Sequence, residues 1–88
     1  MRFRIEQTYL TNEEGTVIPP VGHEVRLHIR EAATVEDALE NFVHADHGEI
    51  VGNVIRFPGF QLIATARRDK SVYTLHLDPV TDMTDVVR

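Results

Sequence analysis

The chain has 88 residues, of which 42% are hydrophobic and 26% charged, with a net charge of −5 and no cysteine. These totals exclude a wholly disordered chain, a disulfide scaffold and a cysteine–zinc site, and they allow one modest hydrophobic core. No apolar run approaches the ~20 residues of a membrane-spanning helix, and the acidic charge argues against general nucleic-acid binding.

Two segments near the N-terminus alternate between apolar and polar residues, which is typical of half-buried strands. In residues 2–10, Phe3 and Ile5 share a face opposite Arg2 and Arg4. Residues 24–30 alternate more regularly, with three apolar side chains facing one way and the polar ones the other: Val25, Leu27 and Ile29 against Glu24, Arg26, His28 and Arg30. We expect the apolar set of each strand to face the core.

One amphipathic helix follows, over about residues 35–46. Thr34 is a suitable N-cap, because its hydroxyl can accept an amide hydrogen of the first turn. Val35, Leu39, Phe42 and Val43 fall on one helical face. This face predicts packing against a sheet.

Three further strands are predicted at residues 49–57, 60–68 and 71–78. Pro58-Gly59 and residues 68–71 make the two links between them, and links this short join antiparallel neighbours. Residues 79–88 are predicted as either a loose tail or a short terminal helix. The chain therefore reads as a single domain over residues 1–88.

The order of elements is β-β-α-β-β-β, which predicts an α+β fold: an antiparallel sheet of four to five strands with one helix packed across one face. The expected core combines the helix with one face of every strand: Phe3, Ile5, Tyr9, Val25, Leu27, Ile29, Leu39, Phe42, Val43, Val51, Ile55, Phe57, Leu62, Tyr73, Leu75 and Leu77.

The opposite face of such a sheet is either solvated or covered by another chain. Alternation places four apolar residues and a basic group on it: Ile50, Val54, Ile63 and Val72, with Arg26, His28 and Arg30. We interpret this face as an interface through which the protein forms a homodimer or binds another protein. The favoured function is a non-enzymatic interaction or regulatory module that needs no cofactor. Because the sequence has no cysteine and no recognisable export signal, we expect the protein in the cytoplasm.

The alternative function is a small-ligand or metal-binding domain, or a minor enzyme, that uses histidine side chains. His44 and His47 are spaced by three residues and could share a metal ion, whereas His28 and His76 could form an acid–base pair on the open face. No nucleophile motif and no glycine-rich phosphate loop is present in the sequence.

Overall fold

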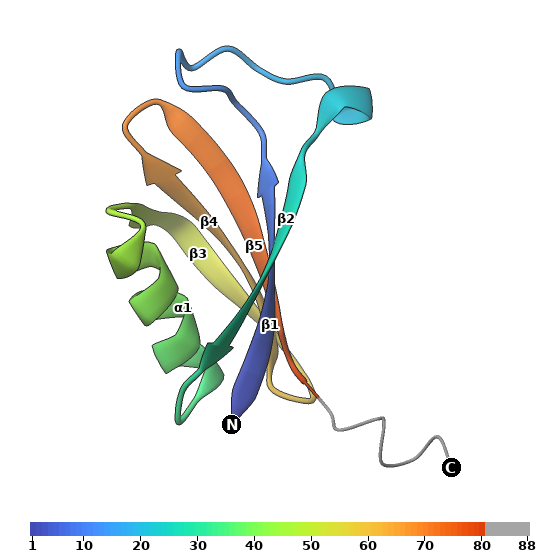
Figure 1. Cartoon of the computed structure of the whole chain (residues 1–88), viewed down its shortest axis with the longest axis vertical. Helices are drawn as coiled ribbons and strands as arrows, with labels where there is room; N and C mark the ends of the chain where they lie inside the picture. Colours follow the sequence, from blue (N-terminus) through green and yellow to red (C-terminus); the bar gives the residue numbers. More distant parts are fainter. Residues whose placement is uncertain (81–88) are drawn as a thin grey trace.

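The strands and the helix of the computed structural model follow the predicted order (Figure 1). The structure describes residues 1–80, so most of the segment predicted as a terminal tail or helix lies outside the described residues. The elements are β1 (Arg2–Tyr9), the 3-10 helix η1 (Pro20–Gly22), β2 (Val25–Glu31), α1 (Val35–Ala45), β3 (Glu49–Phe57), β4 (Gln61–Arg68) and β5 (Ser71–Pro79).

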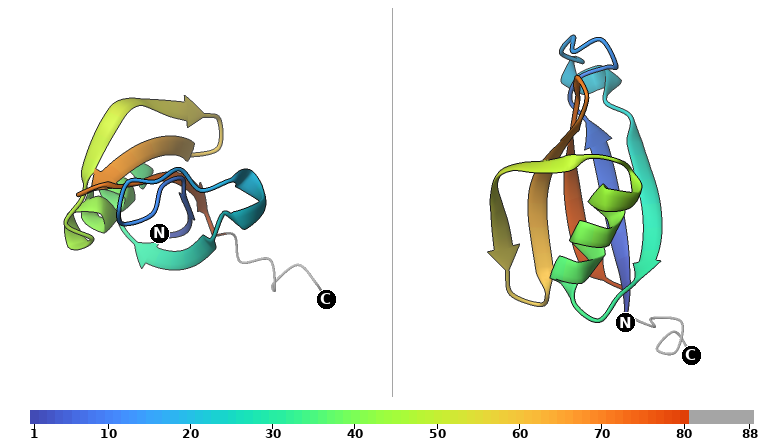
Figure 2. Two further views of the ribbon diagram at one scale, coloured as in Figure 1. Left: turned by 90° about the horizontal axis from the view of Figure 1, so that it is seen from above. Right: turned by 90° about the vertical axis from the view of Figure 1, so that its left-hand side faces the viewer.

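All five strands form one antiparallel sheet in the order β2-β1-β5-β4-β3. The last strand lies at the centre, because β5 pairs with β1 on one side and with β4 on the other. The strand directions rotate steadily across the sheet (Figure 1), and α1 crosses one side of it (Figure 2). The predicted α+β architecture is confirmed.

The ends of α1 follow from its sequence. Thr34 is the N-cap, and its Oγ1 accepts a hydrogen bond of 3.0 Å from the backbone N–H of Asp37. At the other end the N–H groups of His47 and Gly48 donate to the carbonyls of His44 and Val43, in the pattern of a Schellman motif. His47 takes the left-handed conformation that this motif requires, with φ 59°.

The hydrophobic core lies between α1 and the three central strands. Its members are 13 buried residues: Phe3, Ile5, Val35, Ala38, Leu39, Phe42, Val43, Leu62, Ala64, Ala66, Tyr73, Leu75 and Leu77. Around the core, arginines of β3 and β4 pair with acids at or beyond the two ends of α1: Arg56 with Glu36 at 2.9 Å, and Arg68 with Asp46 at 2.6 Å.

The apolar residues of β2 do not face this core, so that part of the predicted core is wrong. Arg30 pairs across the sheet with Phe3, and His28 with Ile5, which places both basic side chains on the helix side. Val25, Leu27 and Ile29 therefore point to the opposite side. The physical reason is the pairing register with β1, since a shift of one residue exchanges the two faces of a strand.

The face of β3 is also reversed from the prediction. Ile50 and Val54 pack against the core, whereas Val51 and Ile55 lie on the same side as Thr65 and Ile63 of β4, away from α1. Gly52 has φ 75° within a bulge, where three residues of β3 face one of β4. Two extra residues leave the alternation unchanged beyond the bulge, so Phe57 points away from α1 as well.

Candidate functional site: the outer sheet face

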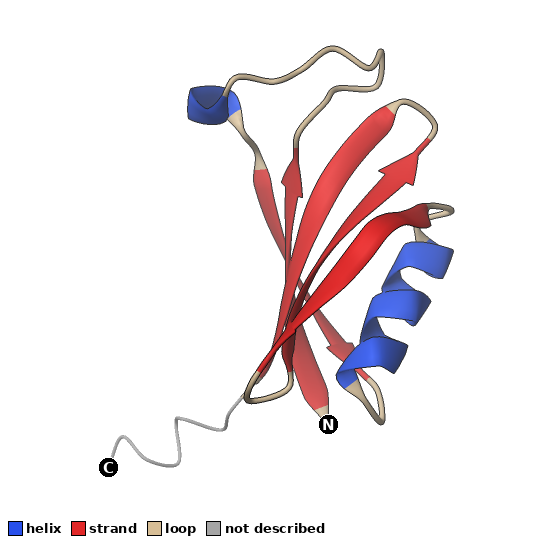
Figure 3. Cartoon of the chain, turned by 180° about the vertical axis from the view of Figure 1, so that it is seen from behind, coloured by secondary structure: helices blue, strands red, loops and turns tan. Residues whose placement is uncertain are grey.

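The side of the sheet that faces away from α1, called here the outer face, is the candidate functional surface. Among residues 1–80, α1 is the only α-helix, and it covers the other side (Figure 3). One row of side chains crosses the outer face through all five strands in the order Leu27, Glu6, His76, Ile63, Ile55. This row begins with apolar Leu27 and ends with apolar Ile63 and Ile55, and the polar residues Glu6 and His76 lie between them.

Both borders of the outer face are apolar and exposed. On β2 the side of Val25, Leu27 and Ile29 is open, and Leu27 is 63% exposed. At the other border Ile55 is 54% exposed, and Phe60, in the turn after Phe57, is 67% exposed. Isolated exposed apolar residues are ordinary on protein surfaces, but grouping along two border strands is typical of a contact surface.

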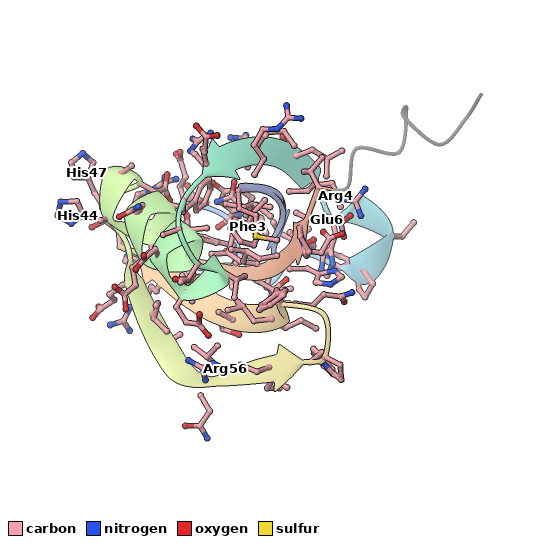
Figure 4. All side chains as sticks on the ribbon, turned by 90° about the horizontal axis from the view of Figure 1, so that it is seen from below. Phe3, Arg4, Glu6, His44, His47 and Arg56 are labelled. Carbon is pink, nitrogen blue, oxygen red and sulfur yellow. The ribbon has the colours of Figure 1, made fainter. Side chains whose placement is uncertain are left out.

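The centre of the outer face is polar and contains one ion pair between neighbouring strands. Arg4 donates two hydrogen bonds to Asp78, of 3.3 Å from Nε and 3.2 Å from Nη2. Glu6 lies directly opposite His76 in the β1–β5 ladder. Figure 4 shows Arg4 and Glu6 projecting away from the side on which Phe3 and α1 lie. The charges of Arg4 and Asp78 thus neutralise one another within one chain.

The seven residues predicted on this face separate into two groups. Ile63 and Val72 lie on it, as the neighbours of His76 and Arg67 in the β4–β5 ladder. The placement of the other five is corrected: Ile50 and Val54 belong to the helix side of β3, and Arg26, His28 and Arg30 to the helix side of β2.

Two of the basic residues of β2, His28 and Arg30, lie beside Phe42 of α1, whereas Arg26 lies over the ring of Tyr9. The rings of His28 and Phe42 have centroids 4.7 Å apart, and the guanidinium of Arg30 lies 5.5 Å from the centre of the Phe42 ring. Long side chains with polar ends suit this border position, because their stems contact the core while their ends reach water. Burial, followed by the charges of Arg30 and Arg26, lowers the pKa of His28.

The sequence predicted two histidine sites, an acid–base pair of His28 and His76 and a metal site at His44 and His47. His28 and His76 lie on opposite faces of the sheet, so the predicted acid–base pair is wrong. His44 and His47 point outward beside the end of α1 (Figure 4). Within residues 1–80 no group of three or more histidine, aspartate or glutamate side chains is placed to hold a metal ion. Metal binding by this pair of histidines stays a prediction.

Sequence reasoning missed the residues that actually form the apolar borders: Val25, Leu27, Ile29, Val51, Ile55, Phe57 and Phe60. Alternation had identified most of them as members of a common face. The missing information was the side on which the helix lies, and only the pairing with β1 and β4 supplies it.

Comparisons with protein-family models, with curated proteins and with solved structures find no match for this chain. No helix among the described residues is long and apolar enough to cross a membrane.

Proposed function

We propose that this protein is a non-enzymatic interaction module that forms a two-fold homodimer by stacking the outer faces of two copies. The observation that carries this proposal is the exposure of the apolar side of β2 while basic residues occupy its helix side. A second copy is a fitting occupant, because a surface with apolar borders, and a polar centre whose Arg4 is paired with Asp78 of the same chain, is compatible with its own copy.

The size of the outer face supports a dimer. With strands about 4.8 Å apart and a rise of about 3.3 Å per residue, five strands of eight residues cover roughly 600 Å². Two such faces together hide about 1,200 Å², which is at the lower end of stable protein–protein interfaces. The proposed dimer therefore depends on most of the face being used.

Stacking of faces suits this chain better than pairing of its β2 edges. Antiparallel pairing of two β2 strands about their middle would bring Arg26 of each copy beside Arg30 of the other, and like charges opposite one another are destabilising. In a stacked dimer whose two-fold axis runs parallel to the strands, β2 of each copy instead lies over β3 of the other. The apolar borders then cover one another on both sides of the polar centre.

The test is the sedimentation behaviour of the purified chain from micromolar to hundreds of micromolar concentration. We expect a concentration-dependent mass that approaches two chains. Thr74 lies on the outer face of the central strand, beside Thr8 and Thr65. Thr74→Lys introduces a charge at the middle of the stacked faces, so we expect it to leave only single chains.

Asn41→Lys is the matched control, because it makes the same change of charge at an exposed position of α1. It should dimerise like the unmodified protein. Circular dichroism checks that both variants are folded. A chain that stays monomeric throughout this range, or two variants with the same affinity, would overturn the proposal.

The cytoplasm remains the proposed location, since a chain without cysteine needs no oxidising compartment.

A further inference from the structure

A second feature of the molecule lies on the opposite side of the sheet, where a polar cleft opens between β2 and the C-terminal half of α1. Its volume is about 160 Å³, and its walls come from four elements: Gln7, Tyr9, Arg26, His28, Arg30, Phe42, Ala45, Asp46 and Arg68. We propose that this cleft binds a small oxyanion group, a carboxylate or a phosphate, held by Arg30 and Tyr9 with Arg26 at the rim.

The charge of the cleft is positive although the chain as a whole carries −5. Three arginines line it against one acid, Asp46. Asp46 is already engaged, since it accepts hydrogen bonds of 2.6 Å from Arg68 and of 2.7 Å from the hydroxyl of Tyr73. Burial and this bond to Asp46 raise the pKa of Tyr73, which keeps the hydroxyl a donor.

Arg30 is the cation that is available to a ligand. Among residues 1–80 no carboxylate lies within ion-pair distance of its guanidinium, which contacts the Phe42 ring and donates to the carbonyl of Ile29 at 3.1 Å. Arg26 is held over the ring of Tyr9 at 5.3 Å and bonded to exposed Glu24. Guanidinium groups held against aromatic rings are well suited to bind the two oxygens of a carboxylate or phosphate.

The hydroxyl group of Tyr9, at the floor of the cleft, is a further hydrogen-bond donor for a ligand. Gln7 is only 2% exposed, and its Oε1 lies 3.1 Å from Nε2 of His28. Its Nε2 donates to the hydroxyl oxygen of Tyr9 at 3.4 Å, and Nη2 of Arg68 donates to the same oxygen at 3.5 Å. Because the Tyr9 oxygen accepts both bonds, its own hydrogen is free to bind an acceptor in the cleft.

The dimensions limit the ligand to a small anionic group. A cleft of this volume is smaller than the 300–1,000 Å³ that is typical of sites for drug-sized molecules. A neighbouring cleft of about 250 Å³ shares Tyr9, Arg26 and Arg68 and is lined further by Glu13 and Glu24. A larger ligand would therefore place its anionic end beside Arg30 and an uncharged or cationic remainder toward these acids.

His28 lies in the cleft and can serve as a probe of whether an anion is bound there. The groups that face it are Arg26 and Arg30 of its own strand, Gln7 of β1, and Phe42 with the more distant Asp46 beside α1. A bound anion offsets the two arginine charges, so the pKa of His28 rises when the cleft is filled. His76 lies on the other face of the sheet and serves as an internal reference.

The test is a nuclear magnetic resonance titration of the full chain with inorganic phosphate and, separately, with acetate, each against sodium chloride at the same ionic strength. We expect saturable shifts of the His28 ring signals with at least one of the two anions, and none at His76. Saturation by phosphate alone identifies a phosphate site, and saturation by acetate alone identifies a carboxylate site. In acetate, which barely titrates above pH 6, the pKa of His28 should rise relative to chloride if acetate binds.

Arg30→Gln should weaken binding about tenfold or more, because it removes the charge and keeps much of the stem. Arg2→Gln is the matched control: it makes the same change of charge at an exposed residue of β1 that does not line the cleft, and it should bind normally. The proposal is overturned if neither anion gives saturable shifts, or if the two variants bind equally. Repeating the titration with Thr74→Lys separates this site from the dimer, since the cleft does not depend on the outer face.

Discussion

Leu27 offers the sharpest test of the outer face, because it lies at the middle of the apolar border formed by β2. The sequence-based reading buried this side chain beneath α1, whereas in the structure it is 63% exposed on the other side. Leu27→Thr removes most of its apolar surface and keeps a β-branched residue that favours strands. The two placements predict different consequences for this one substitution.

The expected magnitude follows from the exposed area. Full burial of a leucine side chain contributes about 1.5–3 kcal/mol, so the exposed part of Leu27 offers about 1–2 kcal/mol on association. Threonine keeps a methyl group, which leaves a loss of about 1 kcal/mol per copy. A two-fold dimer contains the change twice, so the dissociation constant should rise about 30-fold for a total of about 2 kcal/mol.

The assay is sedimentation equilibrium for the dissociation constant, together with urea unfolding of the monomer at low concentration. The free energy of unfolding of the monomer should change by no more than about 0.5 kcal/mol, as is usual for exposed positions. Val21→Thr is the control, because Val21 is 97% exposed in η1, outside the sheet. The reasoning fails if Leu27→Thr and Val21→Thr dissociate alike, or if Leu27→Thr unfolds the monomer as a core substitution would.

Three further predictions concern the stability of the monomer. His47→Gly should raise the free energy of unfolding by about 0.5–1 kcal/mol in urea titrations, because φ 59° is strained for histidine and not for glycine; an unchanged midpoint would contradict the left-handed cap. Gly48→Ala should lower the melting temperature by several degrees, since its new Cβ would lie 2.7 Å from the hydroxyl of Tyr73; wild-type stability would show that the helix end is less close to β5 than described. Folding lowers the pKa of His28, so the unfolded chain binds more protons, and the free energy of unfolding should decline as the pH falls below about 6.5. His28→Gln should reduce the dependence of this free energy on pH. An identical pH dependence in both proteins would refute the lowered pKa of His28.

Local signals identified the elements of this fold correctly. Thr34 caps α1, the alternating segments form strands, and the short links after Phe57 and Arg68 make β3, β4 and β5 a meander. Each of these features depends on interactions between residues close in the chain: a cap bond, a turn, or a period of two. They require no knowledge of the rest of the molecule, so the sequence suffices for them.

The side of each strand that meets the helix was predicted correctly for the central strands β1, β4 and β5, and wrongly for the two borders. Beneath the middle of α1 only the apolar side of a strand can face the helix, and Phe3, Leu62 and Leu75 are fully buried there. At the borders the helix covers less of the sheet, so Arg30 can lie against Phe42 with its charged end in water while Leu27 points outward. Alternation divides a strand into two faces without assigning either to the core. That assignment comes from pairing with β1 and β4, a tertiary contact between distant residues, and it determines both the outer face and the cleft beside His28.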